Sequence, residues 1–491
     1  LNIIGSTLPE AISTLSFAIR PRVVVKYLGL LSFMLAVLAA VPLMVSIVVG
    51  EYFLTQRYIV VIAFLVIIGL IGTRIEHSDE LQNNEALTVT ALAFILTPLL
   101  MAYPVMGSGL NFMDAWFEAV SAVTTTGLST LESPADKPTT FLFARAWMQW
   151  YGGLGIVVLS VALLMGHHTA IKRLIGSGSE SMMTTTRIYA RRMLIIYSII
   201  SVIGFIILWW LLGDLFLALT HTLTAVSTGG FSSLNSSLGD ISFWSGRYAI
   251  IFLSLLGALP LVLYYRIFRG SWRDVFGDSE FRVLLTVVFI ISMLLSLSIR
   301  DDLNLSWGNA FGHGILLGIS AQTTAGFTSI NIDQLSSHSL ALLIVAMFVG
   351  GGVGSTAGGV KILRLIIFFR MIQLLFQRSA MPSHAVIQSR IGDKVLEENE
   401  ISGALLLIIL YVLVIFISWS VFLLYDYPPL QALFEVCSAT GTVGLSSGIT
   451  SPDLQPLLKF TLCIDMLLGR LEIIALLIIL YPPTWIGKHK E

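Results

Sequence analysis

The sequence predicts an all-α integral membrane protein in which four pseudo-symmetric helical repeats follow an extra N-terminal pair of membrane helices. Two observations lead to this prediction, the composition and a short element that occurs four times. Of the 491 residues, 56% are hydrophobic and 12% are charged, whereas a soluble domain averages about 45–50% apolar and roughly 25% charged residues. So few charges cannot coat a soluble fold of this length, which excludes soluble enzymes and nucleic-acid-binding proteins.

Ten runs of apolar residues are long enough to cross a membrane. A helix needs roughly 20 apolar residues to cross a hydrocarbon core of about 30 Å. The expected membrane segments lie near 25–49, 57–73, 86–103, 140–165, 193–213, 245–265, 281–299, 339–370, 402–425 and 457–481. Four shorter apolar stretches, near 112–124, 214–226, 307–322 and 429–440, are too short to cross and are predicted to be re-entrant helices.

The basic residues predict the orientation. If the four short stretches enter and leave the membrane on one side, most of the 28 Lys and Arg residues fall on the side of the N-terminus. Cytoplasmic loops carry an excess of Lys and Arg. We therefore expect both termini in the cytoplasm and the short stretches on the outer side.

The four short stretches share a sequence pattern. They read FEAVSAVTTTGLS (117–129), THTLTAVSTGGFS (220–232), LLGISAQTTAGFT (316–328) and FEVCSATGTVGLS (434–446). A gapless alignment places one marker glycine in each, namely Gly127, Gly230, Gly326 and Gly444. Each stretch has Ser or Thr six residues before this glycine, then Ala, and Thr two residues before it. Self-similarity at a spacing of about 100 residues is the signature of an internal repeat.

The repeats divide the chain into five expected parts. These are an N-terminal tail with the extra helix pair (1–79), repeat one (80–185), repeat two (186–278), repeat three (279–398) and repeat four (399–491). Each repeat is a helix–pore-loop–helix unit, with a short descending helix, a Thr-x-Gly strand and a closing helix. An interfacial loop with a turn glycine would explain any one stretch, but not four gapless matches.

Four such units around one axis would form a site for a monovalent cation. Non-helical backbone at membrane depth is tolerated only where protein buries it or where it lines a watery cavity. Inward-pointing carbonyls can replace the hydration shell of an ion, and the short helices would direct their negative C-terminal ends towards it. The predicted filter consists of Thr125, Thr126, Gly127, Thr228, Gly229, Gly230, Thr324, Ala325, Gly326, Thr442, Val443 and Gly444.

A second candidate site is the stretch GGGVGSTAGG at 350–359, inside the eighth apolar segment. Each glycine costs a regular helix about 1 kcal/mol relative to Ala, and a broken helix at the midplane is a recurrent feature of transporters. Close packing of helices through small residues is the alternative. The predicted gate consists of Gly350, Gly351, Gly352, Gly354, Ser355, Thr356, Gly358, Gly359 and Arg470.

Arg470 belongs to the predicted gate because it lies midway along the last apolar segment. An unpaired guanidinium at that depth costs at least about 2.5–3.5 kcal/mol, so it should face the ion path or find a partner. In the ion path it would be a cationic barrier that helps an ion to leave. The alternative is a structural salt bridge. Glu472 and Asp465 are so close to Arg470 in the sequence that they do not by themselves decide between the two roles.

Three features resemble the Trk/Ktr/HKT superfamily of cation transporters: the TTTGLS element, the four degenerate loops, and QWYGGLGIVVLSVALL at 149–164. The length and the helix pair at 25–73 are most similar to the TrkH-type potassium-uptake subunits. Glycine at all four marker positions is associated in this superfamily with potassium permeation. The STGG of repeat two (227–230) and the closing stretch LLGALPLVL (255–263) depart from the pattern, which leaves the finer selectivity open.

The resemblance implies four helix–pore-loop–helix units around one ion path, in a homodimer surrounded by membrane lipid. It implies K+ uptake across the bacterial cytoplasmic (inner) membrane, K+ bound in the filter, no organic cofactor, and an intramembrane gating loop at 350–359. It also implies a cytosolic nucleotide-binding ring of the TrkA type as partner. Candidate docking residues are His167, His168, Lys172, Arg173 and the basic loops at 187–192, 266–282 and 378–394.

Two alternatives to potassium uptake stay open at this point. The nearer one is a Na+-permeable transporter, or one coupled to protons or sodium, on the same scaffold. The other is a membrane-embedded enzyme, which would need a nucleophile–base pair or a metal cluster at a shared depth. It is disfavoured because the sequence contains no HExxH, paired Cys/His or P-loop lysine motif.

Overall fold

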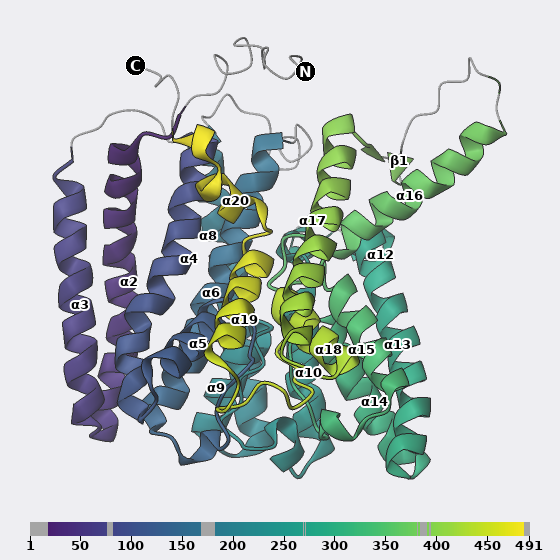
Figure 1. The fold of residues 1–491 in the computed structure, drawn as a ribbon, viewed down its shortest axis with the longest axis horizontal. Coiled ribbons are helices and arrows are strands. Elements are labelled where there is room, and N and C mark those ends of the chain that lie inside the picture. The colour runs from purple at the N-terminus through teal and green to yellow at the C-terminus, as the bar shows by residue number, and fades with distance from the viewer. Residues whose placement is uncertain are drawn as a thin grey trace, which may run out of the picture.

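The computed structural model describes residues 18–75, 82–167, 182–268, 270, 272–380, 382, 390–391 and 394–485. Nearly all regular structure in these ranges is helical, as the sequence predicts. The exceptions are two short strands, β1 (Arg390–Ile391) and β2 (Lys394–Val395), which pair antiparallel. Figure 1 shows the long helices standing side by side, with the N-terminal pair at one edge and α13 at the other.

The helices follow the predicted order. The N-terminal pair is α2 (Pro21–Val49) and α3 (Tyr52–Thr73). Repeat one holds α4 (Asn83–Val105), α5 (Phe112–Val123) and α6 (Thr139–His167). Repeat two holds α8 (Met182–Leu212), α9 (Leu215–Val226), α10 (Trp244–Ala258), α11 (Leu261–Phe268) and α12 (Trp272–Gly277).

The second half of the chain repeats this plan. Repeat three holds α13 (Ser279–Leu303), α14 (Trp307–Gln322), α15 (Ser337–Val349) and α16 (Ile362–Ser379). Repeat four holds α17 (Glu398–Leu423), α18 (Pro429–Thr440), α19 (Pro456–Arg470) and α20 (Ile474–Leu480). Short 3₁₀ turns lie at η1 (Met106–Ser108), η2 (Pro134–Asp136), η3 (Ser237–Asp240), η4 (Ile332–Gln334) and η5 (Pro482–Thr484).

The long apolar helices make this a multi-pass membrane protein. By length and composition, six helices of the described chain can each cross a membrane, namely α2, α3, α4, α8, α13 and α17. The bent pair of α10 and α11 would add a seventh crossing. Large apolar side chains such as Val48, Trp210 and Phe289 are exposed on these helices, as a lipid-facing surface requires.

The four stretches predicted to be re-entrant are the short helices α5, α9, α14 and α18. Each packs against helices of its own repeat and of a neighbouring one. The contacts between repeats are α9 with α6, α14 with α10, α18 with α15, and α5 with α19. This sequence of contacts closes a ring in the order one, two, three, four, one, so the four short helices surround a common centre.

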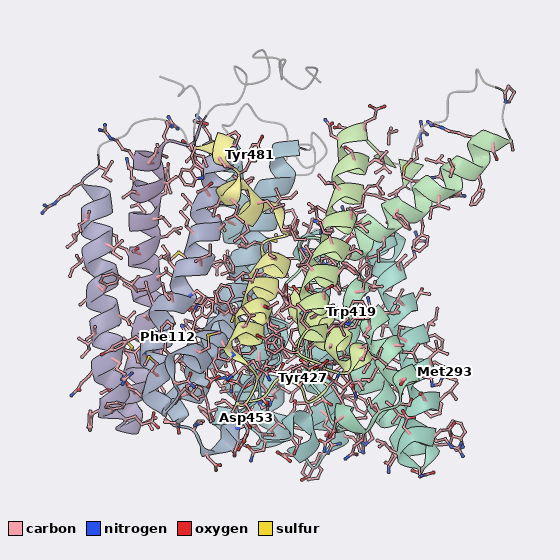
Figure 2. The ribbon with its side chains drawn as sticks, in the orientation of Figure 1. Phe112, Met293, Trp419, Tyr427, Asp453 and Tyr481 are labelled. Carbon is pink, nitrogen blue, oxygen red and sulfur yellow. The ribbon has the colours of Figure 1, made fainter. Side chains whose placement is uncertain are left out.

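The short helices begin towards one end of the molecule. Phe112, at the start of α5, and Asp453, in the loop before α19, lie towards that end, whereas Tyr481 lies at the other (Figure 2). Residues near the two ends of the described chain meet at the end of Tyr481, since the Ile19 N–H donates to the carbonyl of Thr484 at 2.9 Å. The short helices therefore descend from the side opposite to this meeting point.

Two segments predicted to be continuous are broken, so these predictions were wrong. The stretch 245–265 forms α10 and α11, which meet at 91° beside Pro260. Proline lacks an N–H and its ring clashes with the preceding turn. The stretch 457–481 is divided between α19 and α20, where Glu472 and Ile473 have positive φ values of 54° and 62°.

The segment 339–370 is interrupted, as predicted, between the end of α15 and the start of α16. The non-helical part covers residues 350–361, two more than the glycine-rich stretch itself. Of the expected part boundaries, 278/279 and 398/399 lie at the starts of α13 and α17, and 185/186 lies inside α8. The boundary at 79/80 falls outside the described residues.

Candidate functional site

Each of the four short helices ends in the same turn. The threonine two residues before the marker glycine has a positive φ in every repeat: 55° at Thr125, 51° at Thr228, 54° at Thr324 and 49° at Thr442. The N–H of this threonine donates to the carbonyl of the alanine three residues before it. The N–H of the following residue donates to the carbonyl five residues before that residue, and these distances are 2.8–3.2 Å in all four repeats. This is a Schellman turn with Thr where Gly is usual. A β-branched residue with positive φ is strained, and such strain persists where the surroundings over-determine it.

The marker glycines bring the four turns into contact. A Cβ atom on Gly127 would lie 2.2 Å from the carbonyl oxygen of Gly229 in the next repeat. The other three pairs are Gly230 with the Ala325 oxygen at 2.1 Å, Gly326 with the Val443 oxygen at 2.0 Å, and Gly444 with the Thr126 oxygen at 2.1 Å. Each marker glycine therefore abuts a carbonyl of the following repeat, and the series returns to its start. We call the oxygens of Thr126, Gly229, Ala325 and Val443 the carbonyl ring.

The structure brings all of the predicted filter residues together around this ring. Their threonine, alanine and valine side chains are buried. Among the described residues, no group donates a hydrogen bond to the ring oxygens of Thr126, Ala325 or Val443. Buried backbone carbonyls are nearly always paired, so three neighbouring unpaired ones mark a place where a cation can supply the missing partner.

Side chains of the short helices brace the ring from behind. The residue nine before the marker glycine contacts the serine two after it in three repeats. These pairs are Glu118 with Ser129 at 2.6 Å, His221 with Ser232 at 3.1 Å, and Glu435 with Ser446 at 2.6 Å. In repeat three, Leu317 occupies this position, and His313 contacts Ser329 at 2.7 Å instead. Both histidines thus have structural partners.

The two carboxylate braces differ in charge balance. Glu118 pairs with the buried Arg145 at 2.9 Å, and the Arg145 guanidinium also lies 3.7 Å from the ring centroid of Phe231, beside the second loop. Glu435 accepts hydrogen bonds from hydroxyl and backbone groups, including Thr450 at 2.8 Å. Arg145 therefore ties repeat one to repeat two through Phe231, whereas Glu435 braces repeat four alone.

The glycine-rich loop, residues 350–361, lies against the carbonyl ring at the C-terminal ends of the short helices. The Gly358 N–H donates to the Thr324 hydroxyl at 2.8 Å, and the Gly359 N–H donates to the Gly441 carbonyl at 3.1 Å. The Thr356 hydroxyl donates to the Gly257 carbonyl at 2.9 Å. Loop 350–361 therefore covers one end of the ring and contacts repeats two, three and four together.

Arg470 approaches this loop from the end of α19. Its guanidinium donates to the Thr356 carbonyl at 2.8 Å and to the Gly152 carbonyl at 3.1 Å, and only 2% of the residue is exposed. Neither nearby carboxylate of the described chain pairs with it, because Asp465 accepts from Ser418 and Glu472 has other partners. The described residues therefore place an arginine without an ion-pair partner beside loop 350–361.

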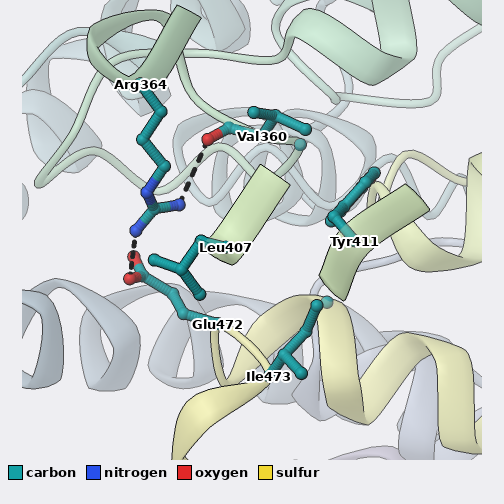
Figure 3. Close-up of a pocket in the computed structure, with 8 residues that line it drawn as sticks. Val360, Arg364, Leu407, Tyr411, Glu472 and Ile473 are labelled. Carbon is teal, nitrogen blue, oxygen red and sulfur yellow. Dashed lines mark hydrogen bonds and ion pairs between the residues drawn. The ribbon is translucent and has the colours of Figure 1, made fainter. Parts of the chain in front are cut away.

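Glu472 is held by two basic residues, one at the end of loop 350–361 and one in the first turn of α16. Figure 3 shows the second of these, Arg364, bonded to Glu472 and to the Val360 carbonyl. The Glu472 carboxylate pairs with Lys361 at 2.9 Å and with Arg364, which also donates to the Val360 carbonyl at 3.1 Å. We call Lys361, Arg364 and Glu472 the latch. Beside it lies a cavity of about 10 Å³, lined by Leu407 and Tyr411 among others, which is the space of about one water molecule.

Sequence reasoning missed the latch, the histidine brace of repeat two, and Gln149. Gln149, on α6, donates to the Gly229 ring oxygen at 2.6 Å. A signal for the latch was present, since Lys361 and Glu472 are charges inside apolar segments. The proposed partner-docking residues His168, Lys172 and Arg173 lie outside the described part of the chain, as does most of 378–394 after Ala380.

Short helices whose C-termini surround a ring of backbone carbonyls, inside a bundle of membrane helices, define a membrane cation-transport protein. The chain belongs to the TrkH family of cation transport proteins, whose family model matches residues 53–482. Membership confirms the resemblance drawn from the sequence and makes the chain a transport protein rather than an enzyme.

Several known proteins are similar over nearly the whole chain. An uncharacterized cation transporter of Methanocaldococcus jannaschii is 29% identical over 450 residues, which cover 91% of this chain and 92% of that protein. The Trk system potassium uptake protein TrkH of Escherichia coli K12 is 26% identical over 491 residues, covering 94% and 99%. The crystal structure of the potassium transporter TrkH from Vibrio parahaemolyticus shares the fold, with a TM-score of 0.84, 24% identity and coverage of 95% and 100%.

Proposed function

We propose that the protein takes up K+ across a bacterial cytoplasmic membrane, with the carbonyl ring as selectivity filter and with loop 350–361 and Arg470 as gate. The carbonyl ring is the observation that carries this proposal. Three of its four oxygens accept no hydrogen bond from the described residues, and unpaired carbonyls are the ligands that replace the hydration shell of K+. The four short helices add the negative ends of their dipoles.

Potassium as the transported ion rests on relatives and on the marker glycines. The relatives from Escherichia coli and Vibrio parahaemolyticus are named as potassium transport proteins. All four marker positions are glycine, and in each of them a side chain would collide with a ring oxygen. The proposed ring is therefore as open as the backbone permits, which suits the larger alkali ions.

In the proposed mechanism, an ion enters from the side on which the short helices begin. It exchanges water for the ring oxygens and then meets the hydroxyls of Thr125, Thr228, Thr324 and Thr442. Beyond them, loop 350–361 closes the path and Arg470 adds a positive charge that disfavours occupancy. Opening requires the loop to leave Thr324 and Gly441, and no covalent chemistry is needed.

The proposal extends to assembly and organisation. The relatives are named as parts of a Trk system. We propose that this chain likewise works in such a system, as a homodimer with a cytosolic nucleotide-binding ring of the TrkA type as its partner. We keep the five-part division of the chain, with the boundary between repeats one and two moved ahead of α8. Both termini are proposed to lie in the cytoplasm, on the side where Ile19 meets Thr484.

Cation flux into proteoliposomes that hold the purified full chain tests this proposal. The flux of K+, Rb+, Na+ and Li+ is compared for the wild type and for Gly127→Ser, whose Cβ would lie 2.2 Å from the Gly229 oxygen. We expect K+ and Rb+ to lead Na+ and Li+, and Gly127→Ser to narrow the difference. Equal permeation of all four ions would retain a pore but overturn potassium selectivity.

A further inference from the structure

The side chain of Gln149 joins repeat one to the carbonyl ring of repeat two. It is fully buried, and its Nε2 donates to the Gly229 ring oxygen at 2.6 Å. Its Oε1 accepts from the Phe231 N–H at 3.2 Å. Both ends of the amide are therefore bonded to the backbone on either side of the marker glycine Gly230.

Among the described residues of repeats two and four, none is a counterpart of Gln149. The closing helices can be aligned on glycines that leave room for the last carbonyl of the short helix. A Cβ on Gly152, Gly257 or Gly469 would lie 2.1, 2.4 or 1.9 Å from the oxygen of Val123, Val226 or Thr440, respectively. Three residues before these glycines stand Gln149, Ser254 and Met466. Ser254 donates within its own helix, to Ile250 at 3.2 Å, and a Met thioether cannot donate.

Gln149 also occupies the space that a side chain at position 229 would need. A Cβ on Gly229 would lie 2.4 Å from the Gln149 Cδ. The equivalent positions in the other repeats carry side chains, since they are Thr126, Ala325 and Val443. At position 229 of repeat two, the Gln149 amide of repeat one thus fills the space that a side chain fills in the other repeats. This accounts for the unusual pair Gly229–Gly230.

We propose that Gln149 is a specificity-determining residue of the ion filter. This inference rests on the proposed function of the carbonyl ring. Selectivity in a carbonyl site depends on the number, field strength and mobility of the ligands. The Gln149 N–H occupies one acceptor site of the Gly229 oxygen and fixes the direction of this carbonyl. The oxygen therefore attracts the ion less strongly and moves less when an ion binds. A weaker and less mobile ligand favours K+ over the smaller Na+.

A pair of matched variants tests the proposal by flux in proteoliposomes of the full chain. Gln149→Met removes the amide at similar volume. The control is Gln322→Met, because Gln322 is equally buried and donates to a backbone carbonyl at the same 2.6 Å, but to Gly350 in loop 350–361. We expect Gln149→Met to lower the K+/Na+ flux ratio about two- to tenfold, the range of one neutral hydrogen bond. Gln322→Met should change total flux at an unchanged ratio.

A compensating pair tests the packing and decides the question if Gln149→Met does not fold. Gly229→Ala alone should reduce K+ flux about tenfold or more through overpacking. Gln149→Ala in the same chain should restore part of that flux, because it vacates the space next to position 229. If the K+ flux losses of the two substitutions simply multiply in the double variant, with no recovery of flux, the inference is overturned.

The flux ratio of the wild type distinguishes a failure of the proposed function from a failure of the inference about Gln149. A wild type that passes K+ and Na+ equally overturns the proposed function and, with it, the role of Gln149. A selective wild type together with an unchanged ratio in Gln149→Met overturns the inference alone. The same holds if both glutamine variants shift the ratio equally, since the effect would then not depend on the ring.

Discussion

The carbonyl ring and loop 350–361 are both glycine-rich backbone inside the protein, yet they are held in opposite ways. Each ring segment is fixed by bonds to its own short helix, as in the donation from Thr126 to Ser121 at 2.9 Å. Loop 350–361 is fixed mainly by bonds to other repeats, such as those from Gly359 to Gly441 and from Lys361 to Glu472. The ring can move only if a helix end unwinds, whereas the loop can leave without unfolding any helix.

This difference matches the two proposed tasks. A filter needs ligands at fixed positions, and local hydrogen bonds from a helix end provide them. A gate needs two arrangements of similar free energy. Separate long-range contacts permit this, because one set of contacts can be replaced by another. Positive φ values at Lys361, Glu472 and Ile473 concentrate strain at the contacts of the loop, where strain is characteristic of switch regions.

The largest effect should follow from a side chain in the ring. In Gly326→Ala, the new Cβ would lie 2.0 Å from the Val443 oxygen. Overpacking of about 3 kcal/mol corresponds to a loss of K+ flux of roughly 100-fold, measured in proteoliposomes. Gly448→Ala is the matched control, because Gly448 also has a positive φ, 94°, but its nearest neighbour would be 3.8 Å away. Equal losses in both variants would assign the effect to backbone strain rather than to the ring.

Removing the charge of Arg470 should have the next largest effect. A unit charge near the ion path repels K+ by roughly 2–4 kcal/mol at an effective dielectric constant of about 20. We expect Arg470→Ala to raise K+ flux about tenfold, part of that repulsion being screened, and Arg470→Lys to stay near the wild type. A short deletion within 350–359 should raise flux as well. Unchanged flux in both Arg470→Ala and the deletion would remove the gating role.

Weakening the latch should open the loop more modestly. Glu472→Gln keeps the shape of the side chain but removes the negative charge that holds Lys361 and Arg364. We expect Ser355→Cys, placed in the loop as a reporter, to react about threefold faster with a thiol reagent when Glu472→Gln is added, about the worth of one weakened pair. Both native cysteines, Cys437 and Cys463, are buried, so the chain without Ser355→Cys gives the background. A slower reaction would contradict the latch.

The smallest effect should follow from losing one brace behind the ring. Ser232→Ala removes the partner of His221, a contact of 3.1 Å, and should lower stability by about 1 kcal/mol or less. The midpoint of thermal unfolding should fall slightly, and the K+/Na+ flux ratio should stay near that of the wild type. A large change in the ratio would mean that the braces, and not only the ring segments, set the geometry of the oxygens.

Much of the fold could be predicted because its determinants are local and repeated. Four glycines at similar spacing, each after a short apolar stretch, indicate the short helices and the loops that follow them. The interruption near Gly350 was equally visible, since six glycines in ten residues oppose a helix. The matching positive φ of the four threonines follows from the same local pattern.

The remaining features depend on contacts between distant segments. The break after Arg470 contains neither Gly nor Pro, and Ile473 takes a positive φ that its own side chain disfavours. Only the fold reveals that Glu472 meets Lys361 and Arg364, more than one hundred residues away in the sequence. Gln149 and Gly229 are separated by 80 residues, and nothing in either local pattern indicates that one fills the space beside the other.

The most direct test of the carbonyl ring is to locate an ion in it. Crystals of the protein grown in RbCl would be measured at the rubidium absorption edge, where Rb+ substitutes for K+ and scatters anomalously. We predict an anomalous peak on the common axis of the short helices, in contact with the oxygens of Thr126, Gly229, Ala325 and Val443. A well-ordered ring without a peak, or a peak held by other groups alone, would contradict the assignment of these carbonyls as the filter.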